Sequence, residues 1–309
     1  MKAKNMRITS CFYLASLALA QLANSAPACG GHGDRNTMLV TTSWLAQHLK
    51  DPKLVILGVG QQEEYDKGHI PGSLFLKYSD IKLAKGPTGL TTELPPMTEL
   101  AETFGKLGVT NDSHIILYMT EDWISPTTRV YLTLDAMGLG AHTSILDGGL
   151  PIWQKEKRPV TTDVPTAKRG ALEPCAQSDV ITDLDFVKSN LHHAGVALID
   201  ARIEAHHSGL QTPKDSRTGH IPGAASLPFE KLFDDDTGKM KPVAKVEALL
   251  RAAGVKPGDR VVSYCYIGQR ATAVYFVARY LGYDARLYDG SWEEWNKHTE
   301  LPTEVSVTK

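Results

Sequence analysis

The chain has 309 residues, 42% of them hydrophobic, and its 33 Lys and Arg nearly balance its 35 Asp and Glu, giving a net charge of −2 at pH 7. A nearly neutral chain without runs of one charge gives no reason to expect a nucleic-acid partner or attachment to an acidic membrane surface. The length allows one or two globular domains.

Residues 1–25 have the pattern of a secretory signal peptide: basic residues, then an apolar run from Phe12 to Leu22, then Ala23-Asn-Ser25. We expect cleavage before Ala26, which leaves a mature chain of about 280 residues. The apolar run is short for a membrane span, so an uncleaved anchor is the less favoured alternative. The protein is therefore expected in the periplasm or secreted, with no membrane attachment after cleavage.

Cleavage would leave three cysteines, Cys29, Cys175 and Cys265. Export implies an oxidising compartment, and an odd number of cysteines leaves at least one thiol unpaired. We predict that Cys265 is that thiol. Cys29 and Cys175 precede the first and second domains, and the sequence leaves open whether they form a disulfide or are both free.

The chain repeats itself. The motif Gly68-His-Ile-Pro-Gly72 recurs at 219–223, and Asp147-Gly-Gly with Trp153 is echoed by Asp289-Gly-Ser with Trp295. Two copies of about 130 residues are the simplest account. Each copy alternates short β-branched runs with helical patterns, such as 98–107 and 243–253, which predicts an α/β fold with a mainly parallel sheet flanked by helices.

These patterns divide the chain into a signal peptide (1–25), a first domain (37–160), a linker (161–175) and a second domain (176–305). Only the second copy carries reactive groups at the ends of its strands. Asp200, Arg202 and Cys265 of that copy correspond to Gly58, Gly60 and Met119 in the first. Methionine has no ionisable nucleophile, so the first domain is predicted to be non-catalytic and to wall one side of the cleft.

Several histidines could suggest a metal-binding site. The pairs His192-His193 and His206-His207 are adjacent, and because neighbouring side chains diverge, we expect solvated histidines and no metal site. His69 and His220 occupy the glycine-flanked turn of both copies, which favours a structural role. The polar segment 206–218, with Lys214 and Arg217, has no counterpart in the first copy and is predicted to overhang the cleft.

The stretch around Cys265 combines a strand, a tight loop and a helix. Val261, Val262 and Tyr264 favour a strand, and from Arg270 onward apolar residues recur at helical spacing. Because the thiolate is the nucleophile, it needs positive potential, which loop amides around Gly268, the helix N-terminus and Arg270 can supply. The alternative is a buried structural cysteine.

The loop from Cys265 to Arg270, Cys-Tyr-Ile-Gly-Gln-Arg, resembles the active-site loop of the rhodanese family, whose members carry sulfur as a cysteine persulfide. Two further motifs match it, Asp200-Ala-Arg202 and Tyr288-Asp-Gly-Ser-Trp292 with Trp295. The resemblance implies two tandem rhodanese-like domains. It also implies a catalytic Cys265, a supporting Asp200, substrate-binding Arg202 and Arg270, and an active-site loop that includes Tyr266, Ile267, Gly268 and Gln269.

The function implied by this resemblance is transfer of sulfur from thiosulfate, a small anionic donor, to cyanide or a thiol acceptor. A 3-mercaptopyruvate sulfurtransferase and a persulfide carrier serving a dedicated partner are the alternatives. A related phosphatase is disfavoured, because Cys265 and Arg270 enclose one residue fewer than a Cys-x5-Arg loop. No metal or organic cofactor is needed, and we expect a monomer. The physiological acceptor does not follow from the sequence.

Overall fold

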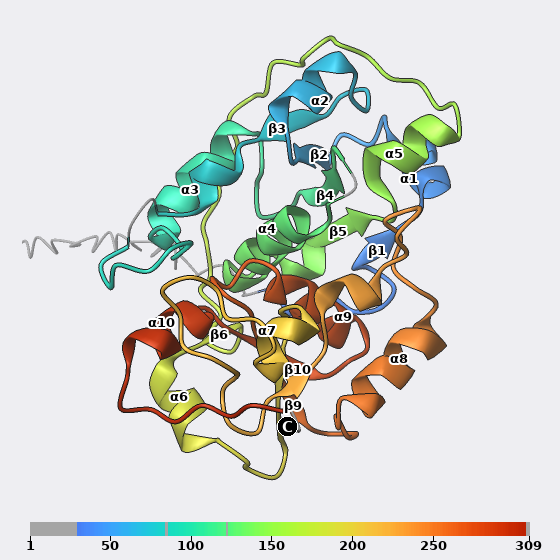
Figure 1. The fold of residues 1–309 in the computed structure, drawn as a ribbon. Coiled ribbons are helices and arrows are strands. Elements are labelled where there is room, and N and C mark those ends of the chain that lie inside the picture. The colour runs from blue at the N-terminus through green and yellow to red at the C-terminus, as the bar shows by residue number, and fades with distance from the viewer. Residues whose placement is uncertain (1–29, 84–85, 122, 307–309) are drawn as a thin grey trace, which may run out of the picture.

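The computed structural model describes residues 30–83, 86–121 and 123–306, which form two lobes that follow one another along the chain (Figure 1). The strands of the first lobe are β1 (Leu39–Val40), β2 (Leu54–Val59), β3 (Leu74–Leu76), β4 (His114–Met119) and β5 (Thr143–Leu146). Its helices are α1 (Thr42–His48), α2 (Gln62–Lys67), α3 (Met97–Lys106), α4 (Ser125–Ala136) and α5 (Gly149–Lys155), with short 3-10 turns η1 (Tyr78–Ile81) and η2 (Gly140–His142).

The second lobe repeats this succession of elements. Its strands are β6 (Ile181–Thr182), β7 (Val196–Asp200), β8 (Ala225–Ser226), β9 (Arg260–Tyr264) and β10 (Asp284–Tyr288). Its helices are α6 (Leu184–Ser189), α7 (Glu204–Ser208), α8 (Val243–Ala252), α9 (Ala271–Tyr280) and α10 (Ser291–Lys297), with one 3-10 turn, η3 (Phe229–Leu232).

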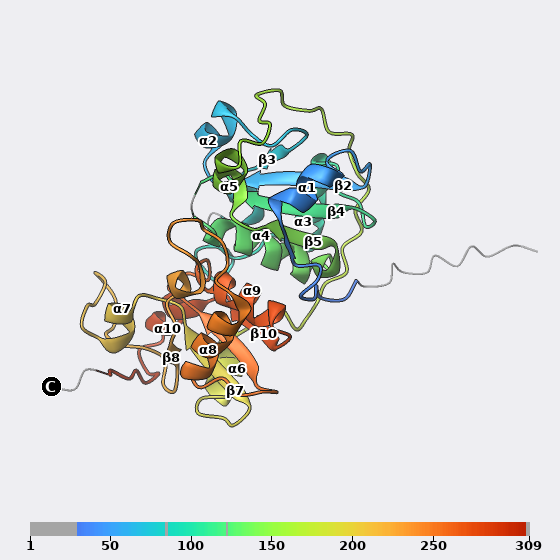
Figure 2. The ribbon, with the colours of Figure 1, turned by 90° about the vertical axis from the view of Figure 1, so that its right-hand side faces the viewer.

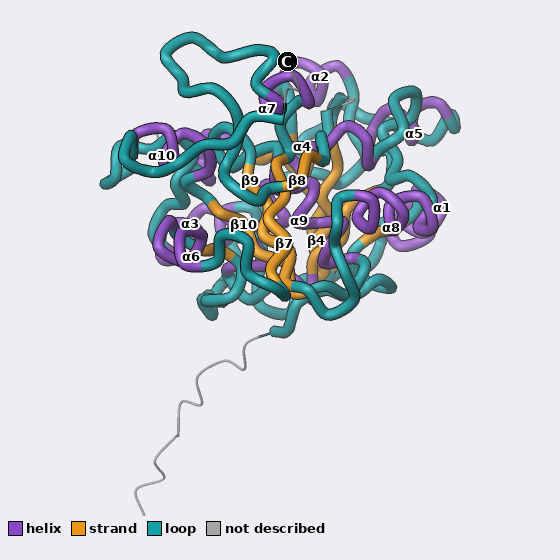
Figure 3. Tube along the Cα trace, turned by 60° about the horizontal axis from the view of Figure 1, so that its bottom comes forward, coloured by secondary structure: helices purple, strands orange, loops and turns teal. Residues whose placement is uncertain are grey.

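Each lobe is built on its own parallel sheet of five strands. The order is β1-β5-β4-β2-β3 in the first lobe and β6-β10-β9-β7-β8 in the second, so equivalent strands occupy equivalent places. Figure 3 shows the strands enclosed by helices, which is why the central strands read as continuous apolar runs such as Leu54-Val-Ile-Leu57. The predicted α/β class, with two tandem domains of mainly parallel sheet, is confirmed.

The register of the central strands confirms the alignment of the two copies. Gly58 of β2 lies opposite Tyr118 of β4, and Asp200 of β7 lies opposite Tyr264 of β9. Met119 therefore occupies the place of Cys265. The site of the second lobe and its degenerate counterpart in the first lie at the same ends of their sheets, the carboxyl ends of the strands.

The lobes meet through α4 and α9, which pack against each other (Figure 2). Every residue of α4 is buried, including polar ones, because one face covers its own sheet and the other meets the second lobe. Thr128 of α4 and Thr272 of α9 share a hydrogen bond of 2.7 Å across this interface. Polar groups buried at such a contact need partners, and for Thr128 one partner comes from the opposite lobe.

The connection between the lobes runs along the first lobe as an extended chain. Gly170 N–H donates to Gly105 O at 2.9 Å, and Cys175 N–H donates to Met137 O at the same distance. Cys175 is disulfide-bonded, while Cys265 is a free thiol. Cys29, whose pairing with Cys175 the sequence left open, and the predicted signal peptide, residues 1–25, lie outside the described residues.

Within the described ranges, no helix combines the length and the apolar character that crossing a membrane requires.

Candidate active site

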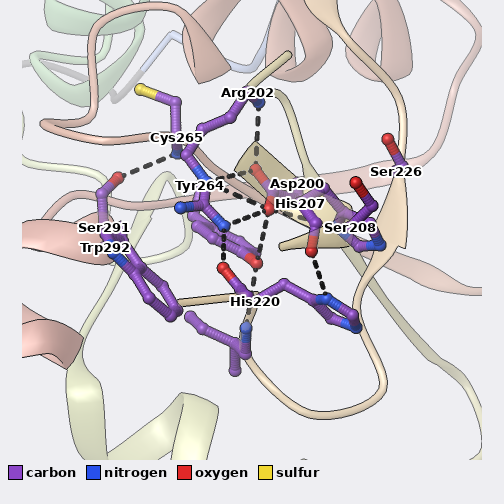
Figure 4. A network of polar contacts seen from close by, with 12 residues as sticks. Asp200, Arg202, His207, Ser208, His220, Ser226, Tyr264, Cys265, Ser291 and Trp292 are labelled. Carbon is purple, nitrogen blue, oxygen red and sulfur yellow. Dashed lines mark hydrogen bonds and ion pairs between the residues drawn. The ribbon is translucent and has the colours of Figure 1, made fainter. Parts of the chain in front are cut away.

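Cys265 lies directly after β9 and is buried, with 1% of its surface exposed. Its backbone is clamped by the start of α10: Cys265 N–H donates to Ser291 Oγ at 3.2 Å, and its carbonyl accepts from Trp292 N–H at 3.0 Å. Ser291 Oγ donates in turn to Tyr288 O at 2.9 Å. In Figure 4 the sulfur atom points away from Ser291, so the backbone is held while the thiol stays free to react.

The loop that follows Cys265 presents a row of free amides. Gly268 has φ +80°, a conformation that glycine adopts without strain, and Arg270 leads into α9. The backbone N–H groups of residues 266–270 donate to no group in the described part of the chain. Unpaired amides in a turned loop before a helix form an anion-binding nest.

Asp200 is fully buried and organises one side of the site (Figure 4). Its carboxylate accepts hydrogen bonds from Arg202 Nε at 3.0 Å and Nη2 at 2.7 Å, and from Tyr264 OH at 3.0 Å. Burial by itself would raise the pKa of Asp200, but hydrogen bonds from His207 and Arg202 outweigh it and lower the pKa to about 2. Asp200 is thus an ionised anchor for Arg202 and no proton donor at neutral pH.

Arg202 lies between Asp200 and an aromatic ring. Its guanidinium stacks over Trp292, 4.4 Å from the ring centroid, and Nη2 also donates to Gly219 O at 2.8 Å. Its Nη1 donates to no group among the described residues, which leaves that nitrogen available to a ligand. The planar fork thus combines a fixed position with a free donor.

These groups surround one cavity of about 340 Å³. Its lining brings together six of the predicted site residues and three residues that were not predicted individually as site residues. The predicted ones are Arg202, Cys265, Tyr266, Ile267, Gln269 and Arg270, and the additional ones are Trp123, His206 and Pro213. Of the remaining predicted residues, Asp200 lies behind Arg202, and Gly268 faces Asp289 and Arg129 on the far side of the loop.

The two arginines of the cavity differ in their charge balance. Arg202 is paired with Asp200, whereas Arg270 is exposed and forms no ion pair with any described carboxylate. Arg270 lies 5.8 Å from the Phe229 ring centroid, an aromatic contact that leaves its charge uncompensated. The cavity therefore offers net positive charge beside a thiol, which suits a small anion.

The prediction of solvated histidines is wrong for one member of the pair His206-His207. His207 is buried, and its Nδ1 lies 3.2 Å from Asp200 Oδ2, because α7 folds back over the end of β7. His206 lines the cavity, and burial together with the nearby charge of Arg202 lowers its pKa. The signal for this was available, since both residues follow Asp200-Ala-Arg202 closely.

Segment 206–218 overhangs the cavity through His206 and Pro213, as predicted. Arg217 does not face the cavity. It anchors the segment by donating to Trp295 O at 3.3 Å and to His298 O at 3.0 Å.

His69 and His220 agree with the structural role predicted for them. Both are buried, and their Nδ1 atoms lie 3.0 Å from Tyr65 O and 2.7 Å from His207 O respectively. No cluster of three or more His, Cys, Asp or Glu that could hold a metal occurs among the residues described.

A buried cysteine at the carboxyl end of a parallel sheet, followed by a loop of free amides and flanked by two arginines, defines a class of cysteine-dependent transferase sites that act on anions. The family model for the rhodanese-like domain matches residues 41–156 and 183–298. The chain belongs to this family and contains two such domains in tandem.

Individual relatives cover nearly the whole chain. The chain is 30% identical to the sulfur carrier protein TtuD of Thermus thermophilus, over 86% of this chain and 95% of that protein. It is 29% identical to a thiosulfate sulfurtransferase of Pseudomonas aeruginosa, over 87% and 97% respectively. The crystal structure of SseA from Escherichia coli, a 3-mercaptopyruvate sulfotransferase, superimposes with a TM-score of 0.72 at 27% identity, covering 83% of this chain and 99% of that one.

Proposed function

We propose that this protein is a thiosulfate sulfurtransferase that moves sulfane sulfur to cyanide or a thiol acceptor through a persulfide on Cys265. One observation carries the proposal: Cys265 lines a cavity together with two arginines, one of which has no carboxylate partner among the described residues. A thiolate and a dianionic donor repel each other, so their approach requires fixed positive charge.

In the first half-reaction, Arg202 Nη1, Arg270 and the loop amides hold the sulfonate oxygens of thiosulfate. The thiolate of Cys265 attacks the outer sulfur and forms a new S–S bond. The S–S bond of thiosulfate breaks, and sulfite leaves with the electron pair. The product is a cysteine persulfide, whose terminal sulfur is held by the amides of residues 266–270.

In the second half-reaction, cyanide attacks the terminal sulfur of the persulfide. Thiocyanate leaves, and the bonding electrons return to Cys265 as a thiolate. A thiolate acceptor reacts in the same way and becomes a persulfide itself. The cycle needs no oxidant, because the sulfur is transferred at its existing oxidation level.

The side chains of the loop support thiosulfate as the proposed donor. Within the family resemblance, mercaptopyruvate enzymes carry small residues after the cysteine, whereas this chain has the bulky Tyr266 and Ile267, and its charge lies at Arg270. This favours thiosulfate over mercaptopyruvate. The similarity to SseA and to a sulfur carrier protein keeps mercaptopyruvate transfer and persulfide delivery to a dedicated protein as the alternatives.

We also propose that the protein is exported and acts as a monomer. Export rests on the pattern of residues 1–25. The monomer rests on the cavity, since one chain supplies its walls from both lobes, Trp123 from the first and the other lining residues from the second.

The test is thiocyanate formation by the mature protein with cyanide, with thiosulfate and mercaptopyruvate as parallel donors and Cys265→Ser as the control. We expect turnover with thiosulfate that the substitution abolishes. Faster turnover with mercaptopyruvate than with thiosulfate would make mercaptopyruvate the preferred donor instead. Equal, negligible rates for the wild type and Cys265→Ser would refute the proposed enzymatic activity and favour a persulfide carrier that serves a dedicated protein partner.

A further inference from the structure

The back of the catalytic loop is held by the first lobe. Two consecutive carbonyls of the loop accept hydrogen bonds from it: Ile267 O from Thr92 Oγ1, and Gly268 O from Arg129 Nη1 at 3.2 Å. Thr92 lies in the segment before α3, and Arg129 lies in α4. The non-catalytic domain thus touches the backbone of the loop itself, in addition to walling the cavity.

The direction of these carbonyls sets the direction of the amides. No peptide bond in the described part of the chain is cis, and in a trans peptide the C=O and the following N–H point to opposite sides. With the carbonyls of Ile267 and Gly268 turned toward the first lobe, the N–H groups of Gly268 and Gln269 face the other way, toward the cavity that Ile267 and Gln269 line. Neither N–H has a partner among the described residues.

Arg129 is held in place by burial and by several hydrogen bonds. It is fully buried, its Nη1 also contacts Asp289 Oδ1 at 2.5 Å, and its Nη2 donates to Thr92 O at 2.6 Å. One planar fork therefore joins the loop, the turn before α10 and Thr92. Lysine cannot reproduce these contacts, because its ammonium is a single point rather than a fork.

Thr92 is equally constrained. It is buried and has φ +69°, a left-handed conformation that is uncommon for a β-branched residue. Its backbone is held in this conformation by Arg129, and its hydroxyl is thereby aimed at Ile267 O. Backbone strain of this kind persists only where the surroundings over-determine it, and it is common at functional sites.

We propose that Arg129 and Thr92 are positioning residues for sulfur transfer: they hold two loop carbonyls away from the cavity, so that the amides of Gly268 and Gln269 face the sulfur of Cys265 and its persulfide. The proposal rests on the proposed function. It assigns to the first domain, which lacks a nucleophile, a direct part in preparing the nucleophile of the second.

The test compares Thr92→Val, Arg129→Met and Arg129→Lys with the control Asp147→Ala. Asp147 Oδ1 accepts from Met240 N–H at 2.9 Å, so the control removes a hydrogen bond between the lobes that does not touch the loop. Two quantities are measured: the rate of alkylation of Cys265 by iodoacetamide as a function of pH, with Cys265→Ser as the blank, and kcat and KM for thiosulfate.

We expect Thr92→Val and Arg129→Met to slow alkylation and lower kcat roughly tenfold, less than the 100-fold or greater loss when an oxyanion-hole donor is removed outright. The alkylation profile should move to higher pH. Arg129→Lys should lie between Arg129→Met and the wild type, and Asp147→Ala should retain the wild-type profile.

The proposal is overturned if Thr92→Val and Arg129→Met keep the alkylation profile and kcat of the control. Should Arg129→Met not fold, Thr92→Val decides alone, since valine has nearly the shape of threonine. Should the wild type transfer no sulfur, the proposed function fails, while the alkylation profile still tests the positioning of the loop.

Discussion

Replacing Asp200 by asparagine changes one charge in the most heavily bonded part of the site. Asp200 has 0% of its surface exposed, and Arg202, His207 and Tyr264 all contact its carboxylate. Asparagine keeps the size but removes the charge. The guanidinium of Arg202, itself 3% exposed, then remains in the interior without a counter-ion.

The expected loss of unfolding free energy can be worked out because removing one partner of a buried ion pair costs far more than removing both partners. Removing one partner of such a pair costs about 3–5 kcal/mol, because the other charge is left uncompensated. The amide oxygen of asparagine still accepts some of the hydrogen bonds, each worth about 1 kcal/mol. We therefore expect Asp200→Asn to lose about 3 kcal/mol of unfolding free energy, near the lower end of that range.

The assay is urea unfolding followed by tryptophan fluorescence, since Trp292 stacks on Arg202 and reports on this domain. With a slope of about 2 kcal/mol per molar urea, the midpoint should fall by about 1.5 M. The matched control is Asp185→Asn, which removes an exposed ion pair with Lys188 and should cost less than about 0.5 kcal/mol.

The double variant Asp200→Asn with Arg202→Met makes the reasoning refutable. If the loss comes from a stranded charge, removing that charge as well should restore part of the stability. A double variant as unstable as the sum of the single variants would refute this explanation. So would an Asp200→Asn protein as stable as the wild type.

Three further predictions concern acid, the loop and the cavity wall. The pKa of Asp200 is about 2 instead of 3.8, so the contribution of its charge to the free energy of unfolding is complete above about pH 4 and is lost as the pH falls toward 2. When unfolding is measured across this pH range, the stability difference between the wild type and Asp200→Asn should shrink by about 2 kcal/mol. Gly268→Ala would place a Cβ 2.7 Å from Asp289 O and should lower kcat at least tenfold. The control Gly72→Ala has the same φ of +80° but open space around it, so it should cost about 1–2 kcal/mol of stability and leave kcat unchanged. Equal kcat values for the two variants would contradict this prediction. Trp123→Ala should raise KM for thiosulfate about fivefold, the effect of about 1 kcal/mol of lost contact, with kcat little changed; a loss confined to kcat would count against a wall role.

The chemistry of the site could be predicted because its residues are close together in sequence. Cys265, Gly268 and Arg270 belong to one loop, and Arg202 follows closely after Asp200, the last residue of β7. Strand, turn and helix patterns around them are local, and parallel strands bring their carboxyl ends to one edge of a sheet. The repeat predicted which domain carries the site, since aligning the two copies placed Met119 opposite Cys265 and indicated that the first domain is non-catalytic.

Contacts between the domains carried no such signal. The hydrogen bond between Arg129 and Gly268 joins residues 139 positions apart, and that between Thr92 and Ile267 joins residues 175 apart. Nothing in the pattern of α4 distinguishes an arginine that braces a catalytic loop from one on a solvated face. The prediction for His207 was wrong for a different reason: its closeness in sequence to Asp200 was a signal, but its burial depends on how α7 lies against the end of β7.

The sequence alone determined the two-domain α/β architecture, and it located the candidate nucleophile and the cationic residues beside it, because these depend on local periodicity and on short motifs. Only the tertiary structure decided what surrounds and holds them. The wall at Trp123 and the bracing of the loop by Arg129 and Thr92 arise because the two lobes pack through α4 and α9. The pairing that leaves Arg270 as the uncompensated charge is made within the second lobe, where Asp200 pairs with Arg202 across a short stretch of chain. Docking of two folded domains is a property of their surfaces in three dimensions, and no single segment of the chain encodes it.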